Sequence, residues 1–503
     1  MASPSEKLAK SLQAFRDLQQ AGVVAIRSSN LTRTHRERLI KNGFLHEVMK
    51  GWYVSARPDE KKGESTAWYT SFWSFCADYL NSRFGKRWSL PPEQSLFLHS
   101  GNWAVPQQLL VRSPKGGNKP TKLPHGTSIF DIRTSLPESK QAETIENLRV
   151  FSLPASLVHA GPGMFRTNAI EVRATLAMIS DASEVLSILL EGGHSTIAGR
   201  LAGAFRNIGR DEIADEIIKG MKAADYTVNE IDPFGEVSSL ILGAREPSPY
   251  VTRIRLMWQK MRDPVIEVFP APPEKATDNE VYLRNVDATF VTDAYHSLSI
   301  EGYRVSEALI ERIRDANWDP DNDDKDLENR NALAARGYYE AFQQVKDSVK
   351  KVLEGANAGE IAKQDHGDWY RPLFAPGVTA GIIRPADLAG YRNGPVFIRQ
   401  SMHVPPPKEA VRDLMPAFVN LLRDEEHPAV RNVLGHFIFV YIHPYFDGNG
   451  RMGRFLMNVM MASGGYPWAV IKVDERDAYM GALEQASVQG DIVPFAKFLA
   501  KLL

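Results

Sequence analysis

The sequence contains almost no cysteine. Cys76 is the single cysteine among 503 residues, so no disulfide bond can form within the chain. A chain that folds without disulfides is typical of a reducing compartment. The first ten residues are polar and lack the apolar core of a secretory signal peptide. We therefore expect the protein in the cytoplasm.

Long apolar runs and net charge are also missing. No stretch of about eighteen uncharged apolar residues occurs, so we expect no membrane-spanning helix. The 60 lysines and arginines balance 61 aspartates and glutamates, which leaves a net charge of -1. Such a chain has no overall basic field for nucleic acid, and any such site must be local. With 43% hydrophobic and 24% charged residues, the composition indicates a folded protein, long enough for more than one domain.

Residues 1–60 have the pattern of a small unit of helices and a β-ribbon. Apolar residues recur on one face over 5–21, which predicts an amphipathic helix. Thr34 and Glu37 have the spacing of a capping box and predict the start of a second helix. Two short strands are expected at 44–48 and 52–54. This order is that of a winged helix-turn-helix.

The rest of the chain divides by its pattern. Residues 61–230 alternate strand-like and helical stretches, as in an α+β domain, and 231–280 form a proline-rich connection. A helical domain follows at 281–503, with an acidic surface loop at 318–328. Helices are expected there at 330–353, 409–423, 429–442, 451–463 and 475–487.

The segment with the clearest chemistry runs from His443 to Arg454, between two apolar helices. Gly448 and Gly450 allow a tight turn whose N–H groups point into a hollow. The hollow opens onto the start of the helix near Arg451, and a helix N-terminus attracts anions. The sequence therefore predicts an anion-binding loop.

The side chains of this loop fit phosphate chemistry. Arg451 and Arg454 are three residues apart on one helix, and guanidinium groups match phosphate oxygens. Asp447 is an oxygen ligand suited to Mg²⁺ that bridges two phosphates. His443 can take a proton from an attacking hydroxyl when its imidazole is neutral. Anion cradle, metal ligand and base together indicate phosphoryl or nucleotidyl transfer.

The same glycines also fit the G-x-G-x-x-G pattern of a dinucleotide-binding domain, with Asp474 about 20 residues further on. Two observations oppose this alternative. Five residues from His443 to Asp447 separate the glycines from the preceding apolar segment. Only 55 residues follow Gly448 (503 − 448), too few for the strands that this fold still needs.

The loop resembles the signature of the Fic family, His-x-Phe-x-(Asp/Glu)-Gly-Asn-Gly-Arg-x-x-Arg, with Tyr445 in place of the phenylalanine. The similarity covers roughly 285–503. It implies a mostly α-helical Fic fold with a small β-hairpin flap. It also implies AMP transfer from ATP, with Mg²⁺, to a Ser, Thr or Tyr hydroxyl of a target protein, with self-modification left open.

The resemblance implies a role for each matching residue. His443 would be the base, Asp447 would hold Mg²⁺ and Arg454 would hold the γ-phosphate. The nucleotide-binding residues would be Asp447, Gly448, Asn449, Gly450, Arg451 and Arg454 in the loop, Val396, Phe397, Ile398 and Arg399 in the flap, and Tyr479, Met480 and Ser487 on the adenine side. The flap would pair with the backbone of the target.

A second motif resembles the inhibitory motif of the family, (Ser/Thr)-x-x-x-Glu-(Gly/Asn). Ser297 and Glu301 are one helical turn apart in an inhibitory helix at 290–302, and Gly302 ends it. The resemblance implies that Glu301 pairs with Arg454 and keeps ATP from binding productively.

The N-terminal part resembles the winged-helix unit of AbiEi-type antitoxins, which ends in a turn like Gly51-Trp52-Tyr53. The likeness implies DNA contacts from Arg33, Arg36, Arg38 and Lys41. The alternative is a unit for protein contact, with these charges facing solvent.

Two classes of function remain from the sequence. The first is an adenylyltransferase restrained by Glu301, and the second is a DNA-binding regulator whose Fic domain only senses nucleotide. The intact His443, Asp447 and Arg454 favour the enzyme, because a sensor needs no base. Transfer of another phosphate-bearing group, reverse hydrolysis and a homodimer are left open.

Overall fold

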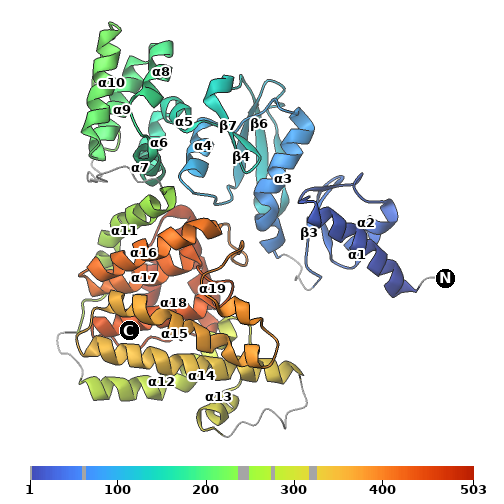
Figure 1. The fold of residues 1–503 in the computed structure, drawn as a ribbon, viewed down its shortest axis with the longest axis vertical. Helices are drawn as coiled ribbons and strands as arrows, with labels where there is room; N and C mark the ends of the chain where they lie inside the picture. Colours follow the sequence, from blue (N-terminus) through green and yellow to red (C-terminus); the bar gives the residue numbers. More distant parts are fainter. Residues whose placement is uncertain (1–2, 59–63, 236–247, 274–277, 317–325) are drawn as a thin grey trace. The chain divides into compact units, whose positions relative to one another are not determined.

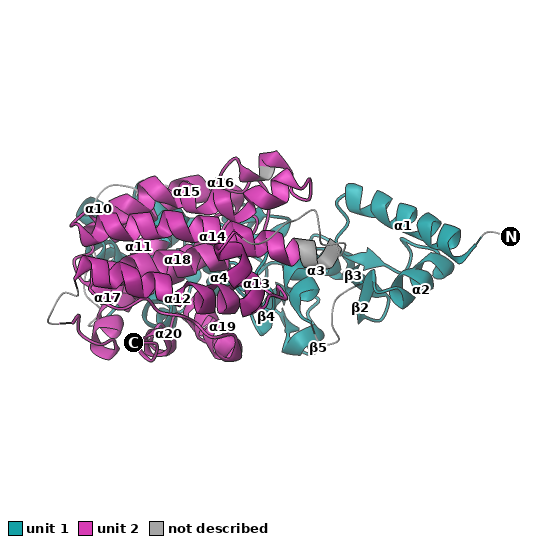
Figure 2. Cartoon of the chain, turned by 90° about the horizontal axis from the view of Figure 1, so that it is seen from below, with its two compact units in different colours: residues 1–253, 397–404 teal, residues 254–396, 405–503 magenta. Residues whose placement is uncertain are grey.

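The computed structural model describes residues 3–58, 64–235, 248–273, 278–316 and 326–503 (Figure 1). The chain forms two compact units (Figure 2). Unit 1 comprises Met1–Arg253 and the short segment Phe397–Val404, and unit 2 comprises Ile254–Val396 and Pro405–Leu503. No helix of the described residues is both long and apolar enough to span a bilayer.

Unit 1 begins with the helices and ribbon expected from the sequence. Its first elements are α1 (Pro4–Gln20), β1 (Ile26–Arg27), α2 (Arg33–Lys41), β2 (Leu45–Met49) and β3 (Trp52–Ser55). The strands form an antiparallel sheet in the order β1-β3-β2. Phe15, Ile26 and Leu39 belong to a small core that joins both helices to the sheet.

The capping box expected at Thr34 is wrong. The N-cap of α2 is Thr32, whose Oγ1 accepts the backbone N–H of His35 at 3.3 Å. The backbone of Thr32 is extended, as an N-cap residue requires. The side chain of Glu37 instead accepts a hydrogen bond from Arg33 at 2.6 Å, one turn earlier on the helix.

The second part of unit 1 begins with two helices, continues with its strands and ends with a run of helices. Helices α3 (Thr66–Phe84) and α4 (Pro92–His99) accompany a sheet in the order β4-β6-β5, in which β4 (Gln108–Ser113) and β6 (Ser128–Arg133) are parallel. The remaining strands are β5 (Pro120–Lys122), β7 (Ala142–Ile145) and β8 (Leu148–Phe151). The helices are α5 (Leu153–His159), α6 (Pro162–Thr167), α7 (Ala169–Met178), α8 (Ser183–Gly192), α9 (Ser195–Asn207) and α10 (Asp211–Ala223).

The proline-rich connection expected at 231–280 includes the boundary between the two units at Arg253/Ile254, but part of it is a helix. Helix α11 (Pro249–Val268) occupies it and contains Pro264. The side chains of Ile254, Met257 and Met261 are buried at helical spacing. Burial of this apolar face outweighs the hydrogen bond that one proline removes.

The regular secondary structure of unit 2 is helical among its described residues, and loops join the helices. The helices after α11 are α12 (Asn279–Ile300), α13 (Glu307–Arg314), α14 (Asp326–Leu353), α15 (Ala358–Thr379), α16 (Lys408–Asp424), α17 (Pro428–Ile442), α18 (Asn449–Ser463), α19 (Arg476–Glu484) and α20 (Val493–Ala500). The mostly α-helical fold is therefore confirmed. The acidic loop expected at 318–328 lies largely outside the described residues.

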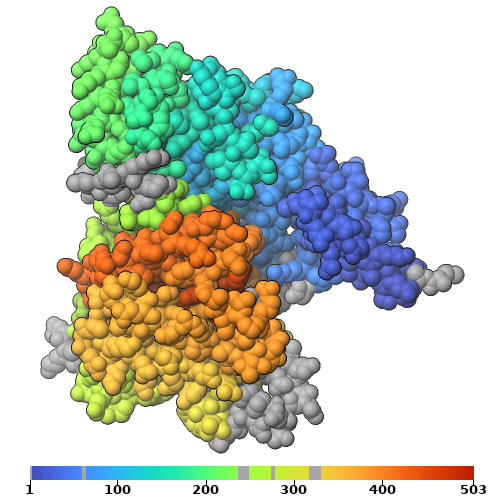
Figure 3. All heavy atoms as spheres, viewed as in Figure 1, coloured from blue at the N-terminus to red at the C-terminus, as the bar shows by residue number. Residues whose placement is uncertain are grey.

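Helices α17 and α18 form the centre of unit 2. Nearly every residue of both helices is buried, including polar Asn449 and Asn458. In the space-filling view, the amber and orange atoms of α14, α15 and α16 cover much of the visible face of this unit (Figure 3). The loop 443–448 joins the two central helices, so both of its ends are held rigidly.

The β-hairpin flap expected around 396–399 is not present among the described residues. Residues 395–398 belong to no strand, and Gln400 has a positive φ of 61° that turns the chain. A strand requires a neighbour along its edge. Pro395 and the prolines at 405–407 lack the N–H groups with which such a neighbour would pair.

Candidate active site

The loop between α17 and α18 is shaped by two residues in the left-handed region. His443 ends α17 with φ 54° and ψ 60°, and Gly448 is the N-cap of α18 with φ 80°. Positive φ is easy for glycine but uncommon for histidine. A Cβ at position 448 would also lie 2.9 Å from the ring of Phe374. Both the conformation and the space therefore require glycine there.

Asn449 holds the loop from inside. Its Oδ1 accepts the backbone N–H of Tyr445 at 2.9 Å, and its Nδ2 donates to the Tyr445 carbonyl at 2.8 Å. The side chain of Asn449 is only 2% exposed. The amide predicted to cradle phosphate is thus used for loop shape. The backbone N–H of Asn449 is instead one of the unbonded N–H groups at the start of α18.

Tyr445 points into the core. It is 2% exposed and stacks on Tyr370 with ring centroids 3.8 Å apart and an angle of 10° between the planes. The exchange of phenylalanine for tyrosine therefore leaves the apolar packing under the loop in place.

The imidazole of His443 has the tautomer and the charge state that a general base requires. Its Nδ1 donates to the backbone carbonyl of Val440 at 3.1 Å, so the neutral ring carries its lone pair on Nε2. The imidazole tautomer is thus fixed by one backbone bond. Burial lowers the pKa of His443 to about 4, and the charge of Arg392 acts in the same direction. At neutral pH the ring is therefore uncharged and can accept a proton.

The start of α18 forms the anion cradle. The first hydrogen bond within the helix runs from the N–H of Met452 to the carbonyl of Gly448. The three N–H groups before it belong to Asn449, Gly450 and Arg451, and no side chain caps them in the described structure. A helix start of this kind favours an anion through both its N–H groups and its dipole.

Arg451 is aimed at the cradle by aromatic rings. Its side chain is 1% exposed, and its guanidinium lies over Phe374 and Tyr303 at 4.8 and 5.4 Å from the ring centroids. Its Nε has no hydrogen-bond partner within the described part of the chain. A buried donor without a partner is costly, so this group is suited to an incoming acceptor.

Arg454 is bound by the helix α12. Its Nε donates to Ser297 Oγ at 2.8 Å, and its Nη2 donates to Glu301 Oε1 at 2.7 Å. Burial disfavours the ionised form of Glu301, but the charges of Arg454 and Arg451 outweigh burial and hold its pKa below the ordinary value. The same pairing raises the pKa of Arg454 against the effect of burial. The ion pair implied by the resemblance is present, and both partners are charged.

The carboxylate of Glu301 occupies the cradle itself. A Cβ at Gly450 would collide with Glu301 Oε1, so this oxygen lies directly against the first turn of α18. Helix α12 ends at Ile300, and Gly302 follows with φ 90°, which delivers Glu301 at the helix end. Glu301 therefore stands where the cradle would hold a phosphate.

Asp447 fits the role of a Mg²⁺ ligand. Its side chain is 68% exposed, and Oδ2 lies 3.5 Å from Arg451 Nη2. Mg²⁺ in nucleotide sites is bound by one or two carboxylates together with phosphate oxygens and water. One exposed carboxylate beside the cradle meets this requirement. Among the described residues, no group of three or more His, Cys, Asp or Glu could hold a metal ion by itself.

The residues predicted on the adenine side differ in exposure. Tyr479 is 2% exposed, and its hydroxyl donates to His436 Nε2 at 2.7 Å. His436 Nδ1 in turn donates to the Gly453 carbonyl at 2.9 Å, so Tyr479 supports the helix of the cradle. Met480 and Ser487 are half-buried, and Ser487 lies in a π-helical turn, Gln485–Gln489. Contact with adenine stays a prediction for these residues.

The residues predicted for the flap divide between the two units. Val396 belongs to unit 2, while Phe397, Ile398 and Arg399 belong to unit 1. Arg399 Nε donates to Glu64 Oε1 at 2.8 Å, and the Met402 carbonyl accepts the N–H of Val105 at 2.9 Å. The segment is thus fastened to unit 1 by an ion pair and a backbone bond.

Several of the predicted DNA-binding residues form hydrogen bonds within the protein. Arg38 Nη1 donates to the Lys7 carbonyl at 2.8 Å and to Ser11 Oγ at 2.9 Å, which ties α2 to α1. Arg36 Nη1 donates to the Ser28 carbonyl at 2.9 Å. Arg33 and Lys41 are exposed. Arg33 and Lys41 are the more exposed of the four residues, but Arg33 is paired with Glu37 on the same helix, and contact with DNA stays a prediction for all four.

Sequence reasoning missed Arg392, Tyr303 and Phe374. The two aromatic residues form the bed of Arg451, and Arg392 contacts the loop at His443. No sequence pattern could have identified them, because each lies more than 45 residues from its partner in the loop.

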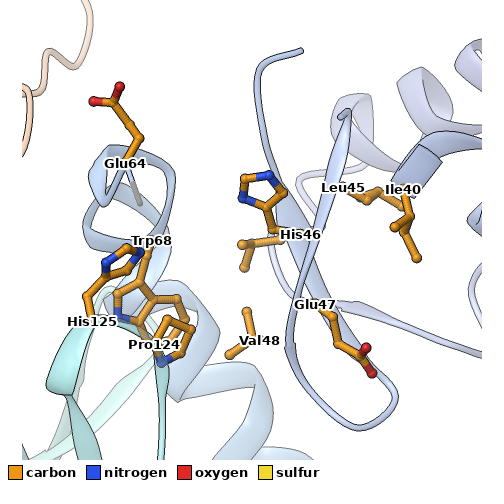
Figure 4. A pocket seen from close by; sticks show the side chains of 10 residues that line it. Ile40, Leu45, His46, Glu47, Val48, Glu64, Trp68, Pro124 and His125 are labelled. Carbon is orange, nitrogen blue, oxygen red and sulfur yellow. The ribbon is translucent and has the colours of Figure 1, made fainter. Parts of the chain in front are cut away.

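A further hollow lies in unit 1 (Figure 4). It is lined by Ile40, Leu45, His46, Glu47, Val48, Val54, Glu64, Trp68, Pro124 and His125. Trp68, Pro124 and His125 lie together on one side, across from His46 and Val48. None of the predicted site residues lines it, and Glu64 is already bound by Arg399.

The chain is similar to known proteins over the region that contains the loop. Residues 363–461 match the model of the Fic/DOC family. Proteins named "Protein adenylyltransferase Fic" from Nematostella vectensis and Drosophila virilis are 30% identical over 290 residues and 29% identical over 226 residues. These alignments cover 55% and 44% of this chain, but only 61% and 43% of the relatives. The chain thus spans less than two thirds of the length of either relative.

Among solved structures, Fic-1 from C. elegans is 20% identical to this chain. The superposition covers 67% of this chain and 93% of that chain, with a TM-score of 0.37.

Proposed function

We propose that the Fic/DOC domain of this chain transfers AMP from ATP to a hydroxyl side chain of a protein. One observation carries the proposal. A neutral histidine with its lone pair on Nε2 adjoins a helix N-terminus with free N–H groups and buried, unpartnered guanidinium donors. These are the requirements of nucleotidyl transfer: a base for the acceptor and charge complementary to the phosphates.

The roles of the residues follow from their positions. The N–H groups at the start of α18 and the guanidinium of Arg451 bind the phosphates of ATP. His443 Nε2 takes the proton of a Ser, Thr or Tyr hydroxyl, and the oxygen forms a bond to the α-phosphorus. The bond to the β-phosphate breaks, and pyrophosphate leaves with its electron pair. Asp447 would hold Mg²⁺, which when bound offsets phosphate charge.

We further propose that Glu301 inhibits this reaction. Its carboxylate is paired with Arg454 at 2.7 Å and stands against Gly450, so it competes with phosphate for the same donors. Two like charges cannot share the cradle without a large electrostatic cost. ATP then binds with its γ-phosphate displaced, or not at all.

The test is AMP transfer from labelled ATP by the full chain. An obstruction of only about 1.4 kcal/mol corresponds to a tenfold change in rate, so we expect Glu301→Gly to increase transfer ~10-fold or more. General-base catalysis contributes about 10²–10⁴-fold, so adding His443→Ala should remove at least ~100-fold of it. Asp413→Asn, an exposed change on α16, serves as the control. No gain from Glu301→Gly would sink the inhibitory role, and full activity without His443 would sink the base.

The first helices and strands of unit 1, from α1 to β3, support a second proposal, DNA binding. The hairpin β2–β3 follows α2 directly, as the wing follows a recognition helix. Arg33 and Lys41 are exposed on α2 and can reach phosphates. DNA binding by these N-terminal elements would then determine where the Fic/DOC domain acts.

A further inference from the structure

Arg392 is a buried cation whose guanidinium donates to backbone carbonyls at the start of the catalytic loop. The residue is 2% exposed, and the charge of Glu409 acts against the lowering of its pKa by burial. Its Nε donates to the His443 carbonyl at 2.7 Å, and its Nη2 donates to the Ile442 carbonyl at 3.4 Å. Its own backbone N–H donates to the Pro444 carbonyl at 2.9 Å. Three successive residues around the base are therefore held by one arginine.

The same guanidinium also binds the chain on either side of the predicted flap. Its Nη1 donates to the Gly394 carbonyl at 3.2 Å, and its Nη2 donates to the Pro406 carbonyl. A planar guanidinium has five donors in a fixed fork, so it holds several carbonyls in one geometry. Arg392 thereby joins the catalytic loop to both ends of the segment that leads into unit 1.

Physical chemistry explains why a cation is tolerated there. Burial lowers the pKa of Arg392 to about 10, yet the group stays charged at neutral pH. The carbonyls of Ile442 and His443 are at the C-terminus of α17, where helix carbonyls lack partners and the dipole favours a positive charge. Charge-assisted bonds to these carbonyls offset the desolvation of the guanidinium.

The bond from Arg392 acts on the backbone of His443 itself. His443 has an uncommon left-handed backbone, and the bond from Arg392 Nε fixes the direction of its carbonyl. The Nδ1 bond to Val440, which sets the tautomer, depends on the same backbone position. We propose that Arg392 is a positioning residue, which holds His443 in the orientation and tautomer required for proton transfer; this role rests on the proposed AMP transfer.

The charge of Arg392 has a second consequence for His443. Burial and Arg392 lower the pKa of His443, whereas Glu301 on α12 and Asp447 in the loop raise it. Removal of the Arg392 charge should therefore move the pKa of His443 upward. A merely structural role would reduce activity equally at every pH.

The experiment compares Arg392→Gln, Arg392→Lys and Arg412→Gln, each in the full chain with Glu301→Gly. Arg412 is exposed on α16 and serves as the control. A misplacement of about 1 Å at a catalytic group costs ~100-fold, so we expect a loss of that order in kcat for Arg392→Gln. The KM for ATP should change less than ~3-fold, because the cradle at α18 is a separate contact. Arg392→Lys should restore part of the loss, and Arg412→Gln should have no effect.

A pH profile and an NMR titration of His443 complete the test. The acid limb of kcat and the imidazole titration should both move to higher pH in Arg392→Gln and stay in place in Arg392→Lys. An unchanged kcat, or an unchanged titration with an evenly reduced rate, would overturn the positioning role. The titration needs no activity, so it remains decisive if Arg392→Gln is inactive. Failure of Glu301→Gly alone to transfer AMP would instead count against the proposed function.

Discussion

At the scale of single residues, the site is defined by donors that are buried and unused. Arg451 Nε and Arg454 Nη1 lie in the interior without a hydrogen-bond partner among the described residues. Proteins rarely leave such groups unsatisfied unless a ligand meets them. Glu301 meets Arg454 only in part, through Nη2, and leaves its Nη1 free. Glu301 therefore satisfies only part of the donors at the start of α18.

The pKa of His443 predicts how the rate of AMP transfer should depend on pH if His443 is the general base. With a pKa of about 4, the imidazole is neutral throughout the physiological range. Glu301 raises this pKa, so its removal should lower it further. We expect kcat of Glu301→Gly to fall less than ~2-fold from pH 8 to pH 6. An ordinary histidine of pKa about 6.5 would give a fall of about fourfold over the same range.

The measurement is kcat for AMP transfer at saturating ATP in buffers of constant ionic strength. The variant with both Glu301→Gly and His443→Ala gives the background rate at each pH. An acid limb centred near the ordinary value of histidine would show that the base is solvated in the active state.

At the scale of elements, α12 carries a buried carboxyl group besides Glu301, the residue that we propose as the inhibitor. Asp293, Ser297 and Glu301 recur every fourth residue and so share one face of the helix end. Asp293 is 3% exposed, and its Oδ2 accepts the Tyr338 hydroxyl at 2.7 Å. Tyr338 lies on α14, so this bond fixes α12 against the long neighbouring helix. The register of Glu301 over the cradle is thus set two turns earlier.

Asp293 also predicts how stability depends on pH. Burial raises its pKa from 3.8 to about 6, although the bond from Tyr338 and the charge of Arg454 oppose this. The folded state therefore binds more protons than the unfolded state between these values, and the free energy of unfolding falls as pH rises through this window. The change corresponds to ~3 kcal/mol. Asp293→Asn should raise the Tm more at pH 7 than at pH 4.5.

The Tm of both proteins would be measured at the two pH values, with Asp413→Asn on the surface of α16 as control. Equal changes at both pH values would contradict a raised pKa for Asp293.

The elements also show what the sequence could and could not predict. Helices α14, α16, α17, α18 and α19 were predicted closely, because their apolar residues recur at helical spacing and many are buried. Helix α12 begins at Asn279, well before the expected start at 290, and α13 and α20 were not predicted. Helix α15 was missed because Pro372 and Pro376 lie inside it. The loop 443–454 was predicted as a site because its residues are adjacent in sequence. Arg392 was not, because its bonds go to carbonyls, which have no sequence signature.

At the scale of the whole molecule, we propose DNA binding for the N-terminal elements and AMP transfer for the Fic/DOC domain. The first proposal can be tested on its own. Arg33 and Lys41 are exposed on α2, while Lys10 and Arg16 are exposed on α1. Removing each pair changes the charge equally. We expect Arg33→Ala with Lys41→Ala to weaken DNA binding by the full chain and to reduce the slope of log K against log salt by about two. Lys10→Ala with Arg16→Ala should leave both unchanged.

A gel-shift assay on the DNA upstream of the coding sequence, at several salt concentrations, provides the measurement. Equal effects of the two pairs would indicate a general surface attraction, and no shift at any salt concentration would exclude DNA as the partner of this unit.

The segment Phe397–Val404 has a consequence for how the chain is made. It belongs to unit 1, where Met402 and Val404 pack against the core of α3, β4 and β6, but it is encoded near the end of the chain. Domains usually fold as they emerge during synthesis, the N-terminal one first. Here the N-terminal unit must wait for residue 404 before its core is complete, so the ribosome has synthesised four fifths of the protein by the time its first unit can close.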